Sequence, residues 1–181
     1  PTNIGLMLLA TVSARDMGYL SITRMITIIK RLLATVSKLE KWNGHLYNWY
    51  NTNNLSVLRP RYISTVDSGN FIGYLVTLKQ SLKEYRNKPL IDDDIVQGLR
   101  ETCEVSGSMD KNIEMILEDF GNITGKESHE WKGFLDRMVE YGSAASVCSE
   151  KTKSTMQELL SEYDKYYTII IYPEDIEDSS H

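Results

Sequence analysis

Hydrophobic residues recur at helical spacing along most of the chain. Residues 2–16 carry apolar side chains on every side of a predicted helix, so we expect this helix to be buried all round. Residues 23–42 form a second predicted helix, with apolar positions on one face and charged positions elsewhere. A fully buried helix followed by a half-buried one predicts a hairpin with an inner and an outer member.

The pattern changes between residues 45 and 66. Residues 45–50 alternate and are aromatic, which is typical of a short strand. Residues 51–54 predict a turn because they are rich in asparagine, and residues 62–66 predict a second extended piece. We therefore expect a β-hairpin, or a pair of extended segments, between helices.

A third predicted helix covers residues 68–86 and carries an apolar stripe. Asp67, Ser68 and Asn70 lie at its start, and side-chain oxygens of this kind cap the free amides of a first helical turn. One such residue suffices for a cap, so the surplus indicates a binding site. The opening of this helix also resembles Asn3-Ile4-Gly5 in the first helix, and Gly5 there predicts close packing or close approach of a ligand.

From residue 87 onward the sequence predicts four further amphipathic helices. Three aspartates at residues 92–94 predict the start of the first of them, which runs to about residue 105. The last residues, 173–181, are acidic and predict a frayed end. The fold class is therefore mainly α. We divide the chain into residues 1–86, which carry the candidate site, and a helical extension over residues 87–181, within a single incomplete domain.

Composition excludes several classes of function. The apolar fraction of 41% is that of a globular chain, and the net charge of −5 gives no general attraction for nucleic acid or anionic lipid. Cys103 and Cys148 form no metal-binding motif, so we expect no metal, no cofactor and a reduced, cytoplasmic setting. The most apolar run, residues 4–14, is shorter than the roughly 20 residues of a membrane-spanning helix. The chain opens at Pro1 without an initiator methionine, so we expect a piece of a longer protein.

Asp67 is the strongest candidate for chemistry. A carboxylate at a helix start in a polar, aromatic loop can act as acid, base or acceptor for a sugar hydroxyl. The alternative is that it only caps the helix or binds loop amides. Most glycoside chemistry needs a second carboxylate. Asp16 and Glu40 are possible partners, although both lie near helix ends, where solvent or neighbouring basic residues suit them equally well.

The aromatic residues of the predicted hairpin suggest a sugar as ligand. Flat rings beside amide and hydroxyl groups fit both the C–H faces and the hydroxyls of a sugar. The alternative is that these rings pack the loop, and that Arg59 and Arg61 brace it instead of binding an anion. The rings concerned are Tyr47, Trp49, Tyr50 and Tyr62.

Three blocks of sequence resemble the cyclic β-1,2-glucan synthase family. They are PTNIGLMLLATVSARDMGYL, GHLYNWYNT and PRYISTVDSGNFIGYLVTLKQ, in the order and spacing of that family. The resemblance covers residues 1–83. It departs from the family at Asn51, where aspartate is usual, and this weakens the site if that aspartate contributes to it.

The resemblance implies a fold and a set of sugar contacts. It places the blocks in the middle, glucoamylase-like region of a large membrane enzyme, a region that resembles an (α/α)-barrel of helical hairpins and cyclises linear β-1,2-glucan by transglycosylation. The family's catalytic carboxylates are expected on segments beyond residue 181. Asp67 is a catalytic candidate because of its place at a helix start in a polar, aromatic loop, and the resemblance does not assign it that role. Together with Tyr50 from the aromatic segment, the expected sugar contacts are Asn3, Asn48, Trp49, Ser68 and Asn70.

Three hypotheses follow. The chain is part of a β-1,2-glucan cyclising region and is inactive alone, or it is a helical carbohydrate-binding or scaffold module without catalysis, or it is a complete small glycosidase that uses Asp67. The expected partners are a β-glucan oligosaccharide and the remainder of a larger membrane enzyme. A second copy of the chain is also expected to bind if apolar faces are exposed.

Overall fold

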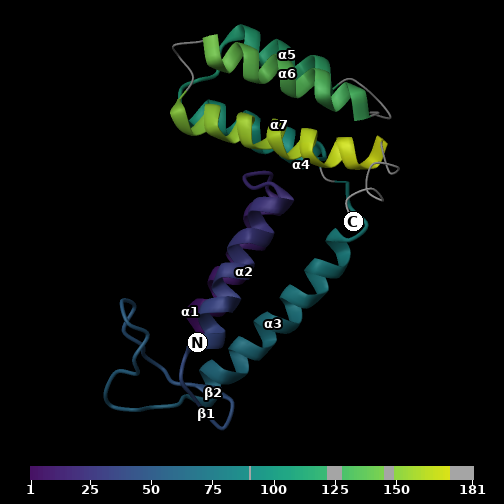
Figure 1. The fold of residues 1–181 in the computed structure, drawn as a ribbon. Coiled ribbons are helices and arrows are strands. Elements are labelled where there is room, and N and C mark those ends of the chain that lie inside the picture. The colour runs from purple at the N-terminus through teal and green to yellow at the C-terminus, as the bar shows by residue number, and fades with distance from the viewer. Residues whose placement is uncertain (90, 122–127, 145–148, 172–181) are drawn as a thin grey trace, which may run out of the picture. The chain divides into compact units, whose positions relative to one another are not determined.

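The computed structural model describes residues 1–89, 91–121, 128–144 and 149–171. Over these ranges the protein is mainly α, with seven helices and a small two-stranded antiparallel sheet (Figure 1). The chain divides into two compact units. Unit 1 comprises Pro1–Asp16 and Ile22–Pro89, and unit 2 comprises Met17–Ser21 and the residues from position 90 onward. The predicted frayed end, residues 173–181, lies outside the described residues.

Unit 1 contains α1 (Thr2–Asp16), α2 (Ile22–Lys38) and α3 (Thr65–Tyr85). Helix α1 packs against both of the others. Helices α1 and α3 are parallel, because their first turns meet at Thr2 and Asp67 and their last turns meet at Asp16 and Tyr85. A Cβ atom added to Gly5 would lie 2.1 Å from Cδ2 of Tyr74, so the prediction of close packing at Gly5 is confirmed. The buried core of this unit consists of Leu8, Val12, Met25, Ile29, Leu78 and Tyr85.

The prediction that the first helix is buried all round is wrong. Leu6 and Met7 are about half exposed, with 48% and 53% of their surface accessible. Thr11 and Arg15 are buried instead. The reason is geometric: α1 has α2 and α3 as neighbours within its unit, and two neighbours do not cover every side of a helix.

The second helix ends four residues earlier than predicted, at Lys38. Asn43 and Gly44 adopt positive φ angles of 48° and 86° and connect β1 (Lys41–Trp42) to β2 (His45–Leu46). Asn-Gly is a preferred two-residue turn of a β-hairpin because both positions need positive φ. The predicted strand over residues 45–50 is therefore wrong in extent, since only its first two residues pair with β1 and Tyr50 forms a separate bridge with Val57.

The third helix begins three residues earlier than predicted. Ser64 is its N-cap, and the Ser64 hydroxyl accepts a hydrogen bond of 3.1 Å from the backbone N–H of Asp67. Residues 65 and 66 are therefore helical and not extended. Asp67 lies within the first turn and is not the cap, a position where a carboxylate is stabilised by the helix dipole.

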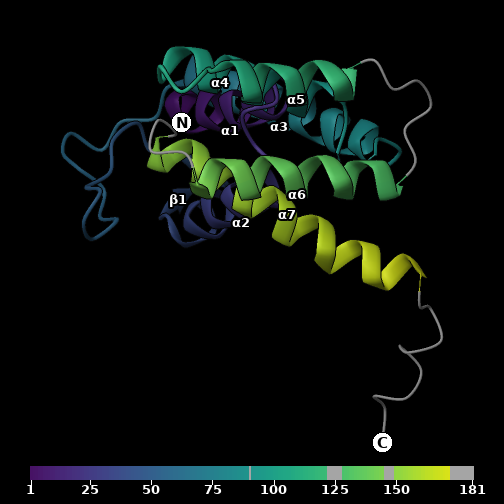
Figure 2. The ribbon, with the colours of Figure 1, turned by 90° about the horizontal axis from the view of Figure 1, so that it is seen from above.

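Unit 2 contains α4 (Asp93–Val105), α5 (Lys111–Gly121), α6 (Ser128–Ala144) and α7 (Glu150–Ile171). Successive helices pack together, and α7 also packs against α4, which closes a four-helix arrangement (Figures 1 and 2). Asp92 caps α4 by accepting a hydrogen bond from the N–H of Ile95, as the aspartates at residues 92–94 predict. Phe120 and Phe134 pack against each other in the core as a tilted pair, with ring centroids 4.2 Å apart. Across the described part of the chain, no helix has the length and apolarity to span a membrane.

Candidate functional site

The first turns of α1 and α3 meet at Asp67. Thr2 Oγ1 donates a hydrogen bond of 2.6 Å to Asp67 Oδ1. The hydroxyl groups of Thr2 and, to a smaller extent, Ser64 lower the pKa of the Asp67 carboxyl. Asp67 is therefore ionised at neutral pH, and it can accept a hydrogen bond or a proton. It is not suited to be the general acid of a glycosidase, since that role needs a raised pKa.

Ser68 lies beside Asp67 and has an unused hydroxyl group. Its side chain is 8% exposed, and its Oγ has no hydrogen-bond partner among the described residues. The residue lines a small cavity of about 80 Å³ together with His45, Leu46 and Phe71. A buried hydroxyl without a partner costs about 1–3 kcal/mol, so a ligand or water that reaches this cavity is stabilised by bonding to it.

The predicted contacts Asn3 and Asn70 lie in the same two helix starts. Both side chains are exposed. No hydrogen bond between described residues ties Asn3 or Asn70 to Asp67. Their location beside the Thr2–Asp67 contact agrees with a shared polar surface, and their role as sugar contacts stays a prediction.

Trp49 and Tyr62 form an exposed aromatic platform. Their ring centroids are 5.8 Å apart at an interplanar angle of 29°, and the two side chains are 46% and 50% exposed. The backbone holds the pair in place, because the N–H of Asn48 donates to Tyr62 O at 2.8 Å and the N–H of Leu58 donates to Trp49 O at 3.1 Å. Exposed, backbone-anchored rings of this kind can stack on the C–H face of a sugar.

Tyr47, Tyr50 and Arg61 brace the loop that carries this platform. The Tyr50 hydroxyl accepts a 2.7 Å hydrogen bond from the N–H of Tyr47 and donates a 2.7 Å bond to Glu40 O. Arg61 lies 4.6 Å from the ring centroid of buried Tyr47, donates to its hydroxyl and pairs with the Glu40 carboxylate. Arg61 therefore braces the loop through these contacts, which is the alternative considered to binding an anion. Tyr50 as a sugar contact stays a prediction, with its hydroxyl engaged by backbone.

The sequence reasoning missed Trp42. This residue is 55% exposed and lines an open groove of about 330 Å³ with Tyr47, Arg61 and Ile63. It was placed inside the second predicted helix. The Asn43-Gly44 dipeptide was the signal that could have located it on a hairpin next to the other rings.

The two carboxylates considered as partners of Asp67 lie elsewhere. Asp16 accepts a hydrogen bond from Tyr85, which is 18 residues beyond Asp67 in the same helix and hence roughly 27 Å away along its axis. Glu40 pairs with Arg61. Among the described residues, no cluster of three His, Cys, Asp or Glu side chains could hold a metal ion. Unit 1 therefore carries an ionised carboxylate and a buried hydroxyl at the helix starts, and exposed rings on the connection between α2 and α3. Groups of these kinds can bind hydroxyl-rich molecules.

Comparison with known proteins finds a relative over part of the chain. No protein-family model matches the chain. The cyclic beta-(1,2)-glucan synthase NdvB of Rhizobium meliloti (strain 1021) is 42% identical over 89 residues. The match covers 49% of this chain and 3% of that relative, so the chain spans a very small fraction of the relative's length. Over about half of its own length, this chain is therefore homologous to a small part of a cyclic β-(1,2)-glucan synthase.

Proposed function

We propose that unit 1 binds β-1,2-linked glucan as part of the cyclising, transglycosylating region of a cyclic β-1,2-glucan synthase. The observation that carries the proposal is the meeting of the α1 and α3 starts at the Thr2–Asp67 hydrogen bond. Hydroxyl and carboxylate groups gather there, and the same unit carries the exposed Trp49–Tyr62 platform. The 42% identity to NdvB supports glucan as the ligand.

We further propose that α1, α2 and α3 are neighbouring helices of an (α/α)-barrel. In such a barrel the inner helices are parallel and the intervening outer helix packs against them. The parallel α1 and α3, with α2 between them in sequence and packed on α1, agree with that plan. The long connection between α2 and α3, which carries Trp42 and Trp49, then lies at the end of the barrel where α3 begins.

The 181-residue chain is proposed to bind glucan without cleaving it. Asp67 is held ionised by the hydroxyls of Thr2 and Ser64. A lone ionised carboxylate can orient a sugar hydroxyl or stabilise positive charge at the reacting carbon, but it cannot also protonate the leaving group. A reaction in the whole enzyme would therefore need a proton donor for the leaving group outside these 181 residues.

Calorimetric titration of the chain with linear β-1,2-glucan oligosaccharides tests this proposal. We expect binding, and we expect the Trp49→Ala variant to bind about tenfold more weakly, which corresponds to about 1.4 kcal/mol. Leu58→Ala is the matched control, because it removes a side chain that is 43% exposed on the same loop and keeps the backbone N–H that anchors Trp49. Absence of binding, or equal affinity in the Trp49→Ala variant, contradicts the proposal.

A non-catalytic carbohydrate-binding module is the second candidate function. The observation that favours it is the location of Asp16 and Glu40 in other contacts, away from Asp67. Chromatography of the oligosaccharides after long incubation separates the two candidates when the chain is supplied with the remaining parts of the synthase. Cyclic products that disappear with Asp67→Asn support a role in the reaction, and products unchanged in this variant support the binding module.

A further inference from the structure

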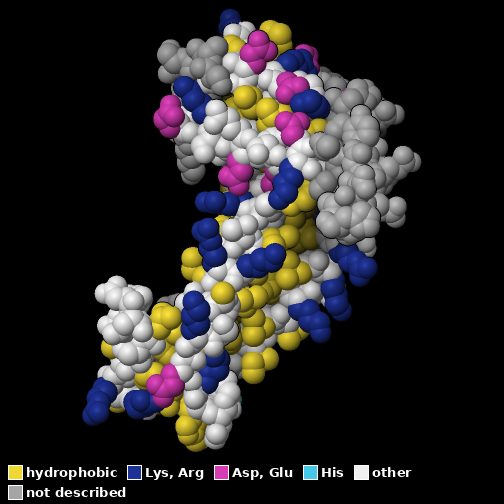
Figure 3. Space-filling view, viewed as in Figure 1, with side chains coloured by type: hydrophobic (Ala, Val, Ile, Leu, Met, Phe, Trp, Pro, Cys, Tyr) yellow, Lys and Arg dark blue, Asp and Glu magenta, His cyan; other side chains and the backbone are white. Residues whose placement is uncertain are grey.

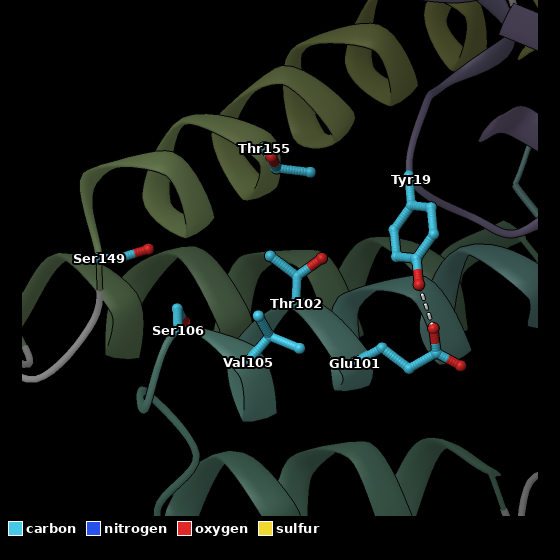
Figure 4. Close-up of a pocket in the computed structure, with 7 residues that line it drawn as sticks. All are labelled: Tyr19, Glu101, Thr102, Val105, Ser106, Ser149 and Thr155. Carbon is cyan, nitrogen blue, oxygen red and sulfur yellow. Dashed lines mark hydrogen bonds between the residues drawn. The ribbon is translucent and has the colours of Figure 1, made fainter. Parts of the chain in front are cut away.

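Unit 2 contains its own cavity, built from residues other than those of the glucan site proposed above. Its volume is about 430 Å³, within the roughly 300–1,000 Å³ of small-molecule sites. Figure 4 shows the lining: Tyr19 comes from residues 17–21, a strip of side chains comes from the end of α4 and its C-cap Ser106, Ser149 precedes α7, and Thr155 lies on α7. Nothing in the proposed function of unit 1 uses these groups.

The wall that carries Tyr19 is fixed by a close contact between two backbones. Gly18 has a φ angle of +75°, and a Cβ atom added to Gly98 of α4 would lie 2.3 Å from the carbonyl oxygen of Gly18. Two glycines therefore let residues 17–21 lie directly on α4. The Tyr19 hydroxyl then donates to the Glu101 carboxylate (Figure 4). The cavity is thus formed before any ligand arrives.

The polar groups of the cavity are mainly hydrogen-bond acceptors. Thr102 Oγ1 donates its hydrogen to Gly98 O at 2.7 Å, and Ser106 Oγ donates its hydrogen to Ser108 Oγ at 2.8 Å. With these hydrogens engaged inside the protein, the oxygens present lone pairs to a ligand. The Glu101 carboxylate adds further acceptor sites, and the bonds from Tyr19 and Gln97 lower its pKa.

The charge of the lining selects against anions. Among the lining residues whose side chains the structure describes, none is a lysine or an arginine, while Glu101 contributes a negative charge. Carbon atoms of the Tyr19 ring and of Val105 supply apolar surface beside the oxygens. A complementary ligand has many donors, apolar C–H groups and no negative charge.

We propose that this cavity is a second ligand site and that it binds a neutral sugar of one or two rings. A sugar ring meets each requirement of the lining, since its hydroxyls donate to the oxygens and its C–H face lies against the apolar wall. This proposal does not depend on glucan binding by unit 1, because the two sites share no residue.

Nuclear magnetic resonance titration of the 181-residue chain with the β-1,2-linked glucose disaccharide tests the proposal. We expect the amide signals of Tyr19, Thr102 and Ser149 to shift and saturate. Val105→Arg should reduce this affinity at least tenfold by placing a long side chain at the cavity, and it should leave the fold unchanged because Val105 is 92% exposed. Met115→Arg, at a position on α5 that is 57% exposed and outside the cavity, is the control and should bind normally.

Two outcomes overturn the proposal. One is that the shifts are confined to unit 1 or absent, and the other is that they persist unchanged in Val105→Arg. Trp49→Ala should leave the shifts of unit 2 intact, so failure of the site in unit 1 is distinguishable from failure of this one.

A pair of neutral and anionic glycosides tests the charge of the cavity lining. Methyl β-glucoside should bind at least tenfold more tightly than methyl β-glucuronoside, which differs by one carboxylate. Glu101→Gln should remove most of this difference. Equal affinities of the two glycosides in the unchanged protein contradict the acceptor-rich, anion-excluding character of the cavity.

Discussion

The two units differ in how completely they bury their apolar residues. Among the residues of unit 2 whose burial the structure describes, fourteen form one buried core and four large hydrophobic residues are exposed: Met17, Tyr19, Val105 and Met115. In unit 1, six buried residues form the core and eleven large hydrophobic residues are exposed. Apolar side chains gather visibly over α2 and α3 on the face of unit 1 shown in Figure 3.

This difference follows from the arrangement of the helices. Each helix of unit 2 has neighbours on its apolar side in a closed ring of four. In unit 1 the apolar helix α1 has two helical neighbours, so Leu6 and Met7 remain accessible, and Ile72 and Val76 of α3 are exposed at 58% and 63%. Surface of this kind marks places where a protein binds something else. The candidate glucan contacts lie in the unit that is less complete by itself.

The largest expected effect concerns the two cores. Phe134→Ala should cost about 3–5 kcal/mol of the stability of unit 2, because Phe134 is fully buried against Phe120 and Trp131. Phe71→Ala, the same change in unit 1, should cost clearly less, since Phe71 is only partly buried. Native-state hydrogen exchange, followed separately in α6 and α3, measures both. Equal costs would remove the distinction between a closed and an open core.

The next largest effect is expected at Gly5, where α1 lies in close contact with Tyr74 of α3. Gly5→Ala should destabilise unit 1 by about 1–3 kcal/mol, because the new Cβ would overlap the base of the Tyr74 ring and force the helices apart. Gly73→Ala is the matched control. It lies inside α3 with open space around it, so alanine should stabilise the helix by up to about 1 kcal/mol. Urea denaturation of both variants gives the sign, and a neutral Gly5→Ala contradicts the tight contact.

The sequence predicted unit 2 better than unit 1 because local signals decide its helices. The aspartates at residues 92–94 predict the start of α4, and the structure confirms that Asp92 is its N-cap. In unit 1 the short elements were missed. The second helix is predicted to run to residue 42, whereas Asn43 and Gly44 form a hairpin turn after a helix that ends at Lys38. The cap residues predicted for the third helix are Asp67, Ser68 and Asn70, whereas its N-cap is Ser64.

The candidate site was less predictable than the fold because it depends on distant contacts. Asp67 and Thr2 are 65 residues apart, and no local sequence pattern predicts the hydrogen bond between them. The similar openings of the two helices suggested shared surroundings, and the contact between their first turns agrees with this. Whether a ring is exposed, as Trp49 is, or buried, as Tyr47 is, depends on neighbours that only the three-dimensional structure supplies.

A smaller loss of stability is expected when either of two helix caps is removed, one in each unit. Ser64→Ala and Asp92→Ala each remove a side-chain acceptor at a helix start, and each should cost about 0.5–2 kcal/mol. The consequences should differ between units. Ser64→Ala should also weaken glucan binding by unit 1, because the first turn of α3 carries Asp67, whereas Asp92→Ala should leave binding by unit 1 unchanged. Calorimetry of both variants measures this, and a matched loss of affinity in Asp92→Ala would contradict the separation of the units.

The smallest effect is the pH dependence of two carboxyl groups, one in each unit. In unit 1 the hydroxyl of Thr2 lowers the pKa of Asp67, and in unit 2 the hydroxyl of Tyr141 lowers the pKa of Asp110. A carboxyl whose pKa is lower in the folded state stabilises the fold above its unfolded pKa of about 3.9. That contribution is lost as the pH falls through the lower folded value.

We therefore expect the stability difference between the unchanged protein and Asp67→Asn to be constant from neutral pH down to about pH 5 and to shrink below about pH 4. Asp110→Asn should show the same course, with its effect confined to unit 2. Hydrogen exchange in the first turns of α3 and α5, measured at a series of pH values, separates the two. The prediction is contradicted if the stability difference between the unchanged protein and Asp67→Asn stays the same at acidic pH. The negative charge of Asp67 would then contribute nothing to holding the starts of α1 and α3 together.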